Sequence, residues 1–119
     1  MENMTPQAER RRCPRISMDL PIEYRVINAS HAHGGLAVNA SEVGILINSI
    51  KNIPIGSKLT IAIIYPKEFE LSHFEVLAEI IWKDFYWEED WEEYRYGLNF
   101  IKMLEEEQWK LKQLLSSQF

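Results

Sequence analysis

The feature of this sequence that most constrains its fold is a series of short segments in which apolar and polar residues alternate. In residues 21–27 the side chains of Ile22, Tyr24 and Val26 alternate with charged ones, which is typical of a strand with one buried face. Similar short apolar segments, separated by turn-forming residues, follow at residues 36–39, 45–47, 59–65, 74–82 and 94–101. This pattern predicts an all-β domain, either an antiparallel barrel or a sandwich.

The longest of these segments, residues 74–82, is followed by an unusual acidic stretch. Its alternation places five apolar side chains on one face, namely Phe74, Val76, Ala78, Ile80 and Trp82. We therefore expect Trp82 to point into the core. In the next stretch, residues 84–93, six of the ten residues are acidic and four are aromatic. Two interpretations fit: a hairpin tip whose acids keep the aromatics soluble, or a loop that docks a partner.

The C-terminal residues, about 103–117, form the one expected helix. Three glutamates lie in its first turn and two lysines come later, an order that complements the helix dipole. Leu104, Leu111 and Leu115 form an apolar stripe along it. We expect this stripe to cover the open face or end of the sheet, with a partner protein or a second copy as the alternative.

The size and composition of the chain predict one cytoplasmic domain. At 119 residues the chain can bury a single core. We expect a flexible N-terminus over residues 1–9 and a single domain over residues 10–119. Cys13 is the one cysteine, so no internal disulfide can form, which fits a reducing compartment. Since no apolar run approaches the roughly 20 residues that cross a membrane, we expect no membrane insertion.

Arginines are concentrated just before the first strand. Four of the six arginines of the chain lie within residues 10–15, although the net charge is −5. The planar guanidinium group suits phosphate and the edge of guanine, because it donates two parallel hydrogen bonds. Pro14 favours an extended backbone, which would place Arg11 and Arg15 on one face. The cluster is therefore either an anion-binding segment or a solvated basic tail.

A second polar stretch, residues 39–44, lies between two predicted strands. Asn39 and Ser41 are two residues apart, so at a strand end they would project to one side. Both side chains can donate and accept hydrogen bonds. Gly44 stands where the chain turns into the next strand, and we expect it to have a positive φ. The alternative is a turn that only satisfies its own backbone groups.

Together the two stretches resemble the PilZ domain family. That family is recognised by an Arg-x-x-x-Arg motif ahead of the first strand and an Asp/Asn-x-Ser-x-x-Gly motif a few tens of residues later. The corresponding residues here are Arg11-Arg12-Cys13-Pro14-Arg15 and Asn39-Ala40-Ser41-Glu42-Val43-Gly44. The short segments at residues 78–82 and 96–100 also resemble sequences of that family. The resemblance covers roughly residues 9–115.

The resemblance implies a six-stranded antiparallel β-barrel of the split or Greek-key type with a C-terminal α-helix. It also implies a bacterial, cytoplasmic and non-catalytic receptor for the second messenger cyclic di-GMP. By the same resemblance, the ligand-binding residues would be Arg10, Arg11, Arg15, Asn39, Ser41 and Gly44. Asn39 stands where the family often has Asp, so the charge assistance of a carboxylate is lost. Trp82 is a further candidate, as a stacking face for a guanine.

The expected mechanism is a change of surface on ligand binding. The Arg10–Arg15 segment would become ordered over the ligand, and this would alter the surface offered to a protein partner of unknown identity. We expect a monomer or a weak dimer. The alternative function is a PilZ-like protein-interaction adaptor that binds no nucleotide.

Other classes of function find little support in the sequence. No catalytic motif is recognisable, so we expect no enzyme activity. Cys13 and the three histidines match no known zinc spacing, so we expect no metal and no cofactor. A single-stranded nucleic-acid binder on a small barrel is a third hypothesis. The acidic net charge argues against it and against DNA binding.

Overall fold

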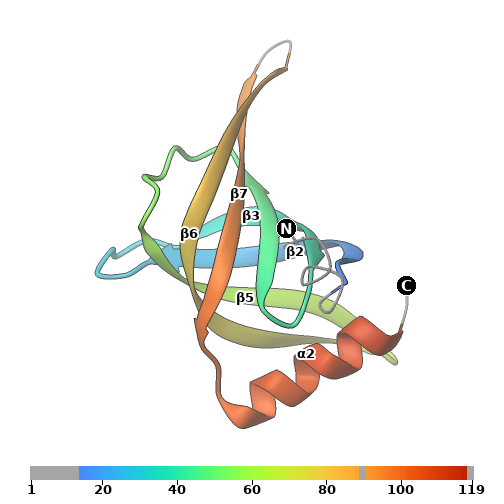
Figure 1. The fold of residues 1–119 in the computed structure, drawn as a ribbon. Helices are drawn as coiled ribbons and strands as arrows, with labels where there is room; N and C mark the ends of the chain where they lie inside the picture. Colours follow the sequence, from blue (N-terminus) through green and yellow to red (C-terminus); the bar gives the residue numbers. More distant parts are fainter. Residues whose placement is uncertain (1–13, 89–90, 118–119) are drawn as a thin grey trace, which may run out of the picture.

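The computed structural model describes residues 14–88 and 91–117 of the chain. Its described elements are β2 (Ile16–Val26), β3 (His33–Ala40), β4 (Gly44–Ser49), β5 (Lys58–Lys67), β6 (Glu70–Glu88), β7 (Trp91–Lys102) and α2 (Glu105–Ser117) (Figure 1). The expected six antiparallel strands and C-terminal helix are confirmed. The flexible segment predicted for residues 1–9 lies outside the described residues.

The six strands form a closed ring in the order β2-β3-β4-β7-β6-β5. All neighbouring strands are antiparallel. The ring closes where β2 pairs with β5, from Ile22 opposite Ile63 to Val26 opposite Leu59. Because successive side chains on a strand point to opposite faces, closure gives each strand one row of side chains inside the ring and one row outside.

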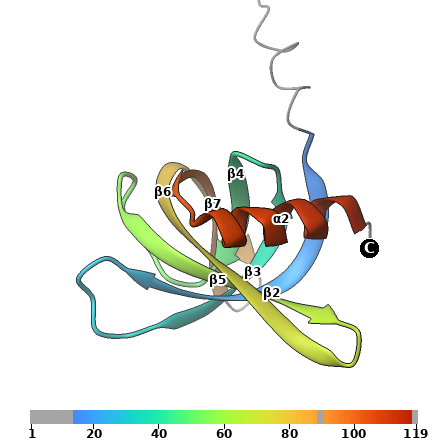
Figure 2. The same ribbon diagram turned by 90° about the horizontal axis from the view of Figure 1, so that it is seen from below.

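Helix α2 lies across one end of this ring (Figure 2). Leu111 and Leu114 are buried in the hydrophobic core, and Leu115 packs against it, so the helix covers the sheet as expected. The predicted stripe was wrong at Leu104, which is 62% exposed because the helix begins one residue later, at Glu105. No helix among the described residues is long and apolar enough to cross a membrane.

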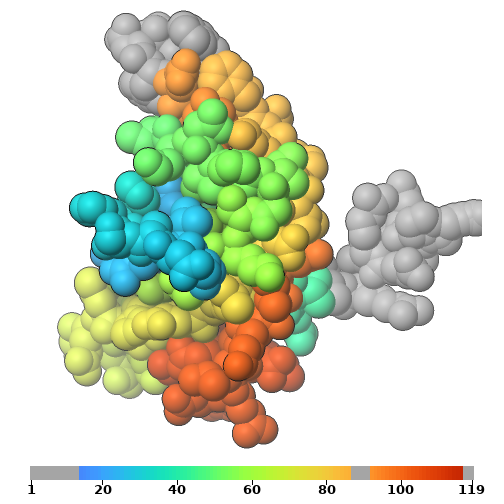
Figure 3. Space-filling model, turned by 90° about the vertical axis from the view of Figure 1, so that its left-hand side faces the viewer, coloured from blue at the N-terminus to red at the C-terminus, as the bar shows by residue number. Residues whose placement is uncertain are grey.

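Strand β6 is 19 residues long and extends beyond the ring at both ends. Its first residues, up to Val76, pair with β5 alone, because pairing with β7 begins only at Leu77. Its last residues pair with β7 alone, ending with Glu88 opposite Trp91. We call residues 84–88 and 91–93 the β6–β7 arm. The arm and helix α2 occupy opposite ends of the molecule (Figure 3). The acidic stretch expected as a hairpin tip or a docking loop is therefore a paired ribbon at residues 84–88 and 91–93.

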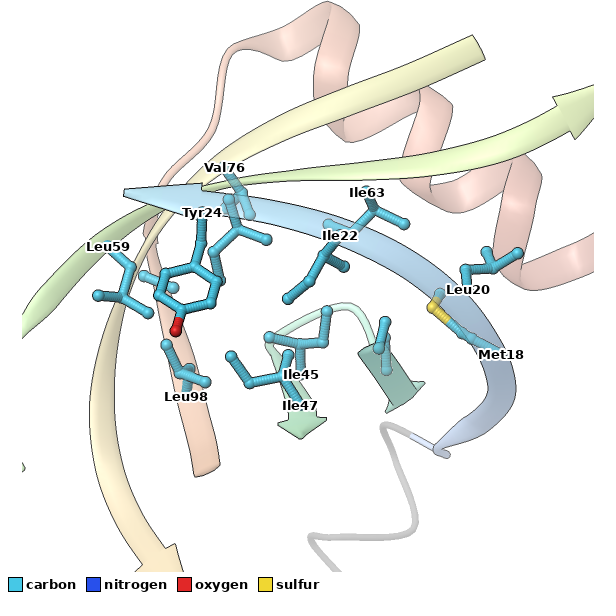
Figure 4. Close-up of a cluster of buried hydrophobic side chains, with 14 of the residues drawn as sticks. Met18, Leu20, Ile22, Tyr24, Ile45, Ile47, Leu59, Ile63, Val76 and Leu98 are labelled. Atoms are coloured by element: carbon cyan, nitrogen blue, oxygen red, sulfur yellow. The ribbon is translucent and has the colours of Figure 1, made fainter. Parts of the chain in front are cut away.

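The interior of the ring is filled by every second residue of its strands. On β2 these residues are Met18, Leu20, Ile22 and Tyr24, all of which are buried (Figure 4). This confirms the alternation expected for residues 21–27, and it extends the strand back to Ile16.

Two buried tyrosines tie the core to the end of β4 and to the loop that follows it. The hydroxyl of Tyr24 lies 2.6 Å from the hydroxyl of Ser49. The hydroxyl of Tyr96 donates to the carbonyl of Lys51 at 2.6 Å and accepts from the backbone N–H of Ile53 at 2.8 Å. Burial raises the pKa of both tyrosines, so both stay neutral donors and acceptors at physiological pH. The loop is thus held by hydrogen bonds from inside the ring.

A buried carboxylate joins helix α2 to β6. Glu107 is only 9% exposed, and its Oε1 accepts the backbone N–H of Glu75 at 2.7 Å. Its Oε2 lies 3.2 Å from the Nζ of Lys110, which also donates to the carbonyl of His73 at 3.2 Å. Beyond the end of β7, the helix thus supplies a hydrogen-bond partner that a neighbouring strand would otherwise provide to β6.

These contacts determine the charge of Glu107. Burial by itself acts to raise the pKa of its carboxyl, but the hydrogen bond from Glu75 and the contacts with Lys110 act in the opposite direction. Together they hold the pKa of Glu107 below its ordinary value of 4.5. A carboxyl whose pKa is lower in the folded than in the unfolded state stabilises the fold above the unfolded-state pKa, and this contribution is lost as the pH falls through the folded-state pKa.

We predict that Glu107→Gln lowers the free energy of unfolding by about 1 kcal/mol at pH 7, since a neutral amide replaces a charge-assisted acceptor. The difference from the wild type should shrink as the pH falls through and below 4.5, where the wild-type carboxyl also becomes neutral. Urea unfolding between pH 3 and pH 7 measures both effects. Glu106→Gln, which changes an exposed glutamate of the same turn, is the matched control. A pH-independent difference would contradict the prediction.

Gly44 marks the closest approach between β4 and β7. It pairs with Asn99, and a Cβ atom built on it would lie 2.5 Å from the backbone carbonyl oxygen of Leu98. No side chain fits there without moving one of the two strands. The expectation of a positive φ was wrong, since Gly56 is the glycine with a positive φ among the described residues. Gly44 is needed for close strand packing, not for an unusual backbone conformation.

We predict that Gly44→Ala lowers the free energy of unfolding by about 2 kcal/mol, because a backbone carbonyl cannot yield as a flexible side chain can. Gly34→Ala is the matched control, because the nearest atom to its added Cβ would lie at 3.9 Å. Its stability should stay near that of the wild type. Urea unfolding of both variants by circular dichroism tests this, and equal midpoints would refute the steric explanation.

Candidate functional site

The two motifs identified in the sequence meet at one end of the β2–β3 pair. Ile16 pairs with Ala40, so the residue before β2, Arg15, lies next to the end of β3. Its guanidinium Nη1 donates a hydrogen bond to Oδ1 of Asn39 at 3.0 Å. The partners are 24 residues apart in the chain. The structure thus brings together one arginine of the first motif and the first residue of the second.

Two irregularities in strand pairing lie beside this contact. Between Ser17 and Leu20 the register of β2 against β3 shifts, and Asp19 in this stretch has a φ of 52°. Between Ala37 and Asn39 the register of β3 against β4 shifts as well. Bulges of this kind redirect side chains and often lie next to functional sites. Here they determine where Asn39 projects at the end of its strand.

Ser41 forms the turn that leads out of β3. It is only 2% exposed. Its Oγ accepts the backbone N–H of Val43 at 3.2 Å, and its own N–H donates to the carbonyl of Gly44 at 2.9 Å. The motif therefore builds a turn that satisfies its own backbone, as the second interpretation held. A hydroxyl that accepts one bond retains its hydrogen as a donor.

Trp82 lies on the outside of the ring, which corrects the expected core position. Its side chain is 44% exposed, whereas Phe74, Val76 and Ile80 on the same strand are buried. The register of β6 against β7 shifts between Ile80 and Trp82, so one extra residue reverses the inside–outside alternation. Sequence alternation carries no sign of such a bulge.

The indole of Trp82 lies over Gly97 of β7. A Cβ atom built on Gly97 would lie 3.2 Å from Cε3 of Trp82, so the ring rests where a larger residue would project. Gly97 was not predicted from the sequence as a site residue. The available signal was a glycine within a strand pattern, which indicates that another group approaches the backbone closely.

Asn39 and Trp82 belong to one row across the outer face of the sheet. Asn39 pairs with Leu46, Leu46 with Gly97 and Gly97 with Trp82. At a strand spacing of about 4.8 Å, the path along the curved outer surface from one end of the row to the other is roughly 14 Å long. Polar donors at Arg15 and Asn39 therefore stand at one end of this row on the outside of the ring. A half-exposed aromatic ring stands at the other.

A groove adjoins the Arg15 end of this row. Its volume is about 430 Å³, and it lies between the start of β2, the turn before β4 and the last turns of α2. The residues that line it are Pro14, Ile16, Glu42, Lys112, Gln113, Leu115 and Ser116. Arg10 and Arg11, the other arginines predicted for the site, lie outside the described residues. Within the described part of the chain, no three His, Cys, Asp or Glu side chains are grouped to hold a metal ion.

The fold is similar to that of several solved structures. Inhibitor of motility (MotI/DgrA) from Bacillus subtilis superposes with a TM-score of 0.68 at 19% identity, covering 89% of this chain and 49% of the other. The PilZ domain of YcgR from Escherichia coli, solved with c-di-GMP, gives 0.67 at 17% identity, covering 91% and 90%. PlzA from Borreliella burgdorferi, in complex with c-di-GMP, gives 0.65 at 16% identity, covering 95% and 54%.

This chain thus spans about half the length of MotI/DgrA and PlzA but nearly all of the YcgR domain. At these identities the superpositions establish a shared fold. No curated protein matches the sequence. The family model described as PilZ domain matches residues 9–117, which is most of the chain and includes both motifs. The chain therefore belongs to the PilZ domain family.

Proposed function

We propose that this chain is a receptor for cyclic di-GMP. The observation that carries the proposal is the hydrogen bond between Arg15 and Asn39, because it joins the arginine segment and the polar turn at one place on the surface. Family membership supports the choice of ligand, as do the YcgR and PlzA structures, which were solved with c-di-GMP.

The chemistry of the row suits a cyclic purine dinucleotide. Such a ligand carries two phosphates and two purines, and so offers both anionic oxygens and flat aromatic faces. Arg15 supplies charged donors for phosphate or for the guanine edge. Trp82 supplies a flat ring for stacking, which contributes about 1–3 kcal/mol per base in comparable contacts. In this proposal Asn39 and Ser41 add short polar contacts, and Gly44 keeps the turn close to β7.

In this proposal the arginines that precede Pro14 extend the same site. Arg10 and Arg11 precede Pro14, and Pro14 lines the groove of about 430 Å³ beside Arg15. Bound phosphate would draw these arginines toward the ring, and the Arg10–Arg15 segment would then cover the ligand. Because the last turns of α2 line the same groove, the covered ligand would change the surface at the helix. We propose that a protein partner recognises this surface, and that the chain acts as a non-catalytic cytoplasmic receptor.

The second candidate, an adaptor that binds no nucleotide, has one observation in its favour. Trp109 on α2 is 59% exposed, and Phe69 at the tip of the β5–β6 hairpin is fully exposed. Exposed aromatic side chains are enriched in protein–protein interfaces. Binding of a protein partner through Trp109 and Phe69 would not require Arg15 or Asn39. Measurements of nucleotide binding on variants of Arg15 and Asn39 therefore separate the two functions.

We predict that isothermal titration calorimetry detects binding of cyclic di-GMP to the wild type. Arg15→Ala should abolish it, since both its charge and its contact with Asn39 are lost. Trp82→Ala should weaken it by about tenfold, because a stacking surface is removed. Arg25→Ala is the matched control, because Arg25 is an exposed arginine at the far end of β2. No heat of binding to the wild type at high micromolar ligand would reject the receptor and favour the adaptor.

We predict that cyclic di-GMP slows amide hydrogen exchange in residues 10–15. The reason is that backbone amides fixed over a bound ligand exchange only when the segment opens. Exchange measured by mass spectrometry, with and without ligand, provides the test. The loop at residues 27–32, at the opposite end of β2 from Arg15, serves as the internal control and should exchange equally in both states. Equal exchange of residues 10–15 under saturating ligand would refute the covering segment.

A further inference from the structure

We infer that copies of this chain associate head to tail, with the acidic β6–β7 arm of one copy docked in an apolar groove beside helix α2 of the next. The inference goes beyond the proposed function, because neither surface includes Arg15, Asn39 or Trp82. It is carried by the composition of the two surfaces and by their placement at opposite ends of the molecule.

The groove lies between the end of β5 and one side of α2, and its volume is about 230 Å³. The strand lines it with Tyr65, Pro66 and Lys67, and the helix contributes Trp109 and Leu114 to its wall. Trp109 is 59% exposed, so much of its indole surface is in contact with solvent. Pockets for small molecules are usually larger, roughly 300–1,000 Å³. The groove is therefore better suited to a large apolar side chain of a protein.

The charge of the groove is positive. No carboxylate is among the described residues that line it, whereas two lysines are. Lys110 is partly neutralised by Glu107, 3.2 Å away, so the exposed Lys67 carries most of the positive charge. Glu68 and Glu70 follow at the tip of the hairpin but do not line the groove. The groove therefore favours an aromatic side chain that belongs to an acidic segment.

The β6–β7 arm has the complementary composition. Residues 84–93 include six acidic and four aromatic residues, and no lysine or arginine. In the described part of the arm, Asp84 and Glu92 are exposed, and Phe85 is 46% exposed. Because the two strands of the arm are paired, these groups are held in place before binding, which lowers the entropy cost of docking. The arm thus offers aromatic surface surrounded by negative charge.

The placement of the two surfaces determines how copies would associate. The arm and α2 occupy opposite ends of the molecule (Figure 3), so an arm cannot reach the groove of its own chain. Two facing grooves would bring lysines together, and two facing arms would bring carboxylates together, which is unfavourable in both cases. Charge therefore favours the contact of arm with groove. Such a heterologous contact produces open chains of molecules, or a ring if the rotation closes.

Sedimentation velocity of the full chain tests this inference, at concentrations from about 10 μM to about 1 mM, which span the weak associations of small interfaces. We expect the sedimentation coefficient of the wild type to rise with concentration beyond that of a dimer. Trp109→Ala should weaken the association by about tenfold or more, because tryptophans often dominate the binding energy of an interface. Lys67→Glu should weaken it by about tenfold, because a like charge then faces the arm.

A double variant of the arm, Glu92→Lys/Glu93→Lys, should also weaken the association by about tenfold. Its matched control is Glu23→Lys/Glu79→Lys, which changes the net charge equally at one exposed and one half-buried glutamate outside both surfaces. The control should associate at least as well as the wild type, because it reduces the overall repulsion between acidic chains. Thermal unfolding at the wild-type temperature verifies that each variant is folded.

A mixture of two defective variants tests the head-to-tail geometry. Trp109→Ala keeps an intact arm, and Glu92→Lys/Glu93→Lys keeps an intact groove. At a concentration where neither variant associates alone, we expect the mixture to form a dimer through one wild-type contact and to grow no further. In a symmetric dimer that joins two grooves or two arms, one defective variant would not rescue the other.

Three outcomes would overturn the inference. The first is a sedimentation coefficient of the wild type that does not rise up to the highest concentration. The second is wild-type association by Trp109→Ala or by the arm variant, which would place the contact elsewhere. The third is a mixture in which both variants stay monomeric. None of these measurements involves a nucleotide, so the proposed receptor function is tested separately.

Discussion

The alternation of side chains between the inside and the outside of a closed ring is the constraint on which the rest of this structure depends. Every strand of the ring is paired on both sides along its central part, so a side chain can change sides only where an extra residue enters the pairing. Such shifts occur beside Asn39 and before Trp82. The same departures from regular pairing that interrupt the core thus expose the polar and aromatic ends of the candidate site.

The sequence predicted the six strands, their order along the chain and the C-terminal helix, because half-buried strands and an amphipathic helix leave periodic patterns. It could not predict Trp82, because a bulge reverses the alternation without changing the residue types on either side. It misplaced Leu104, since one residue at a helix end decides whether a side chain joins the apolar stripe. The role of Gly44 was also missed, because the approach of β4 to β7 is a tertiary contact.

The candidate site itself was predictable only as two separate motifs. Residue types indicated hydrogen bonding at Asn39 and anion binding at Arg15, but their contact depends on the pairing of β2 with β3. That contact fixes which atoms remain for a ligand. The electrostatic character of the site is therefore a property of the pair, and it differs from what either residue would offer alone.

Gly44 shows why a sequence motif need not be a list of ligand contacts. The Cβ that it lacks would collide with the carbonyl of Leu98, on the opposite strand. In a mutational survey scored only by nucleotide affinity, changes at this position would be grouped with those at Arg15, although they would act through a strained sheet. The losses of affinity at residue 44 and at residue 15 would look alike in such a survey. Only a parallel measurement of folding stability would separate the residue that maintains the sheet from the residue that contacts the ligand.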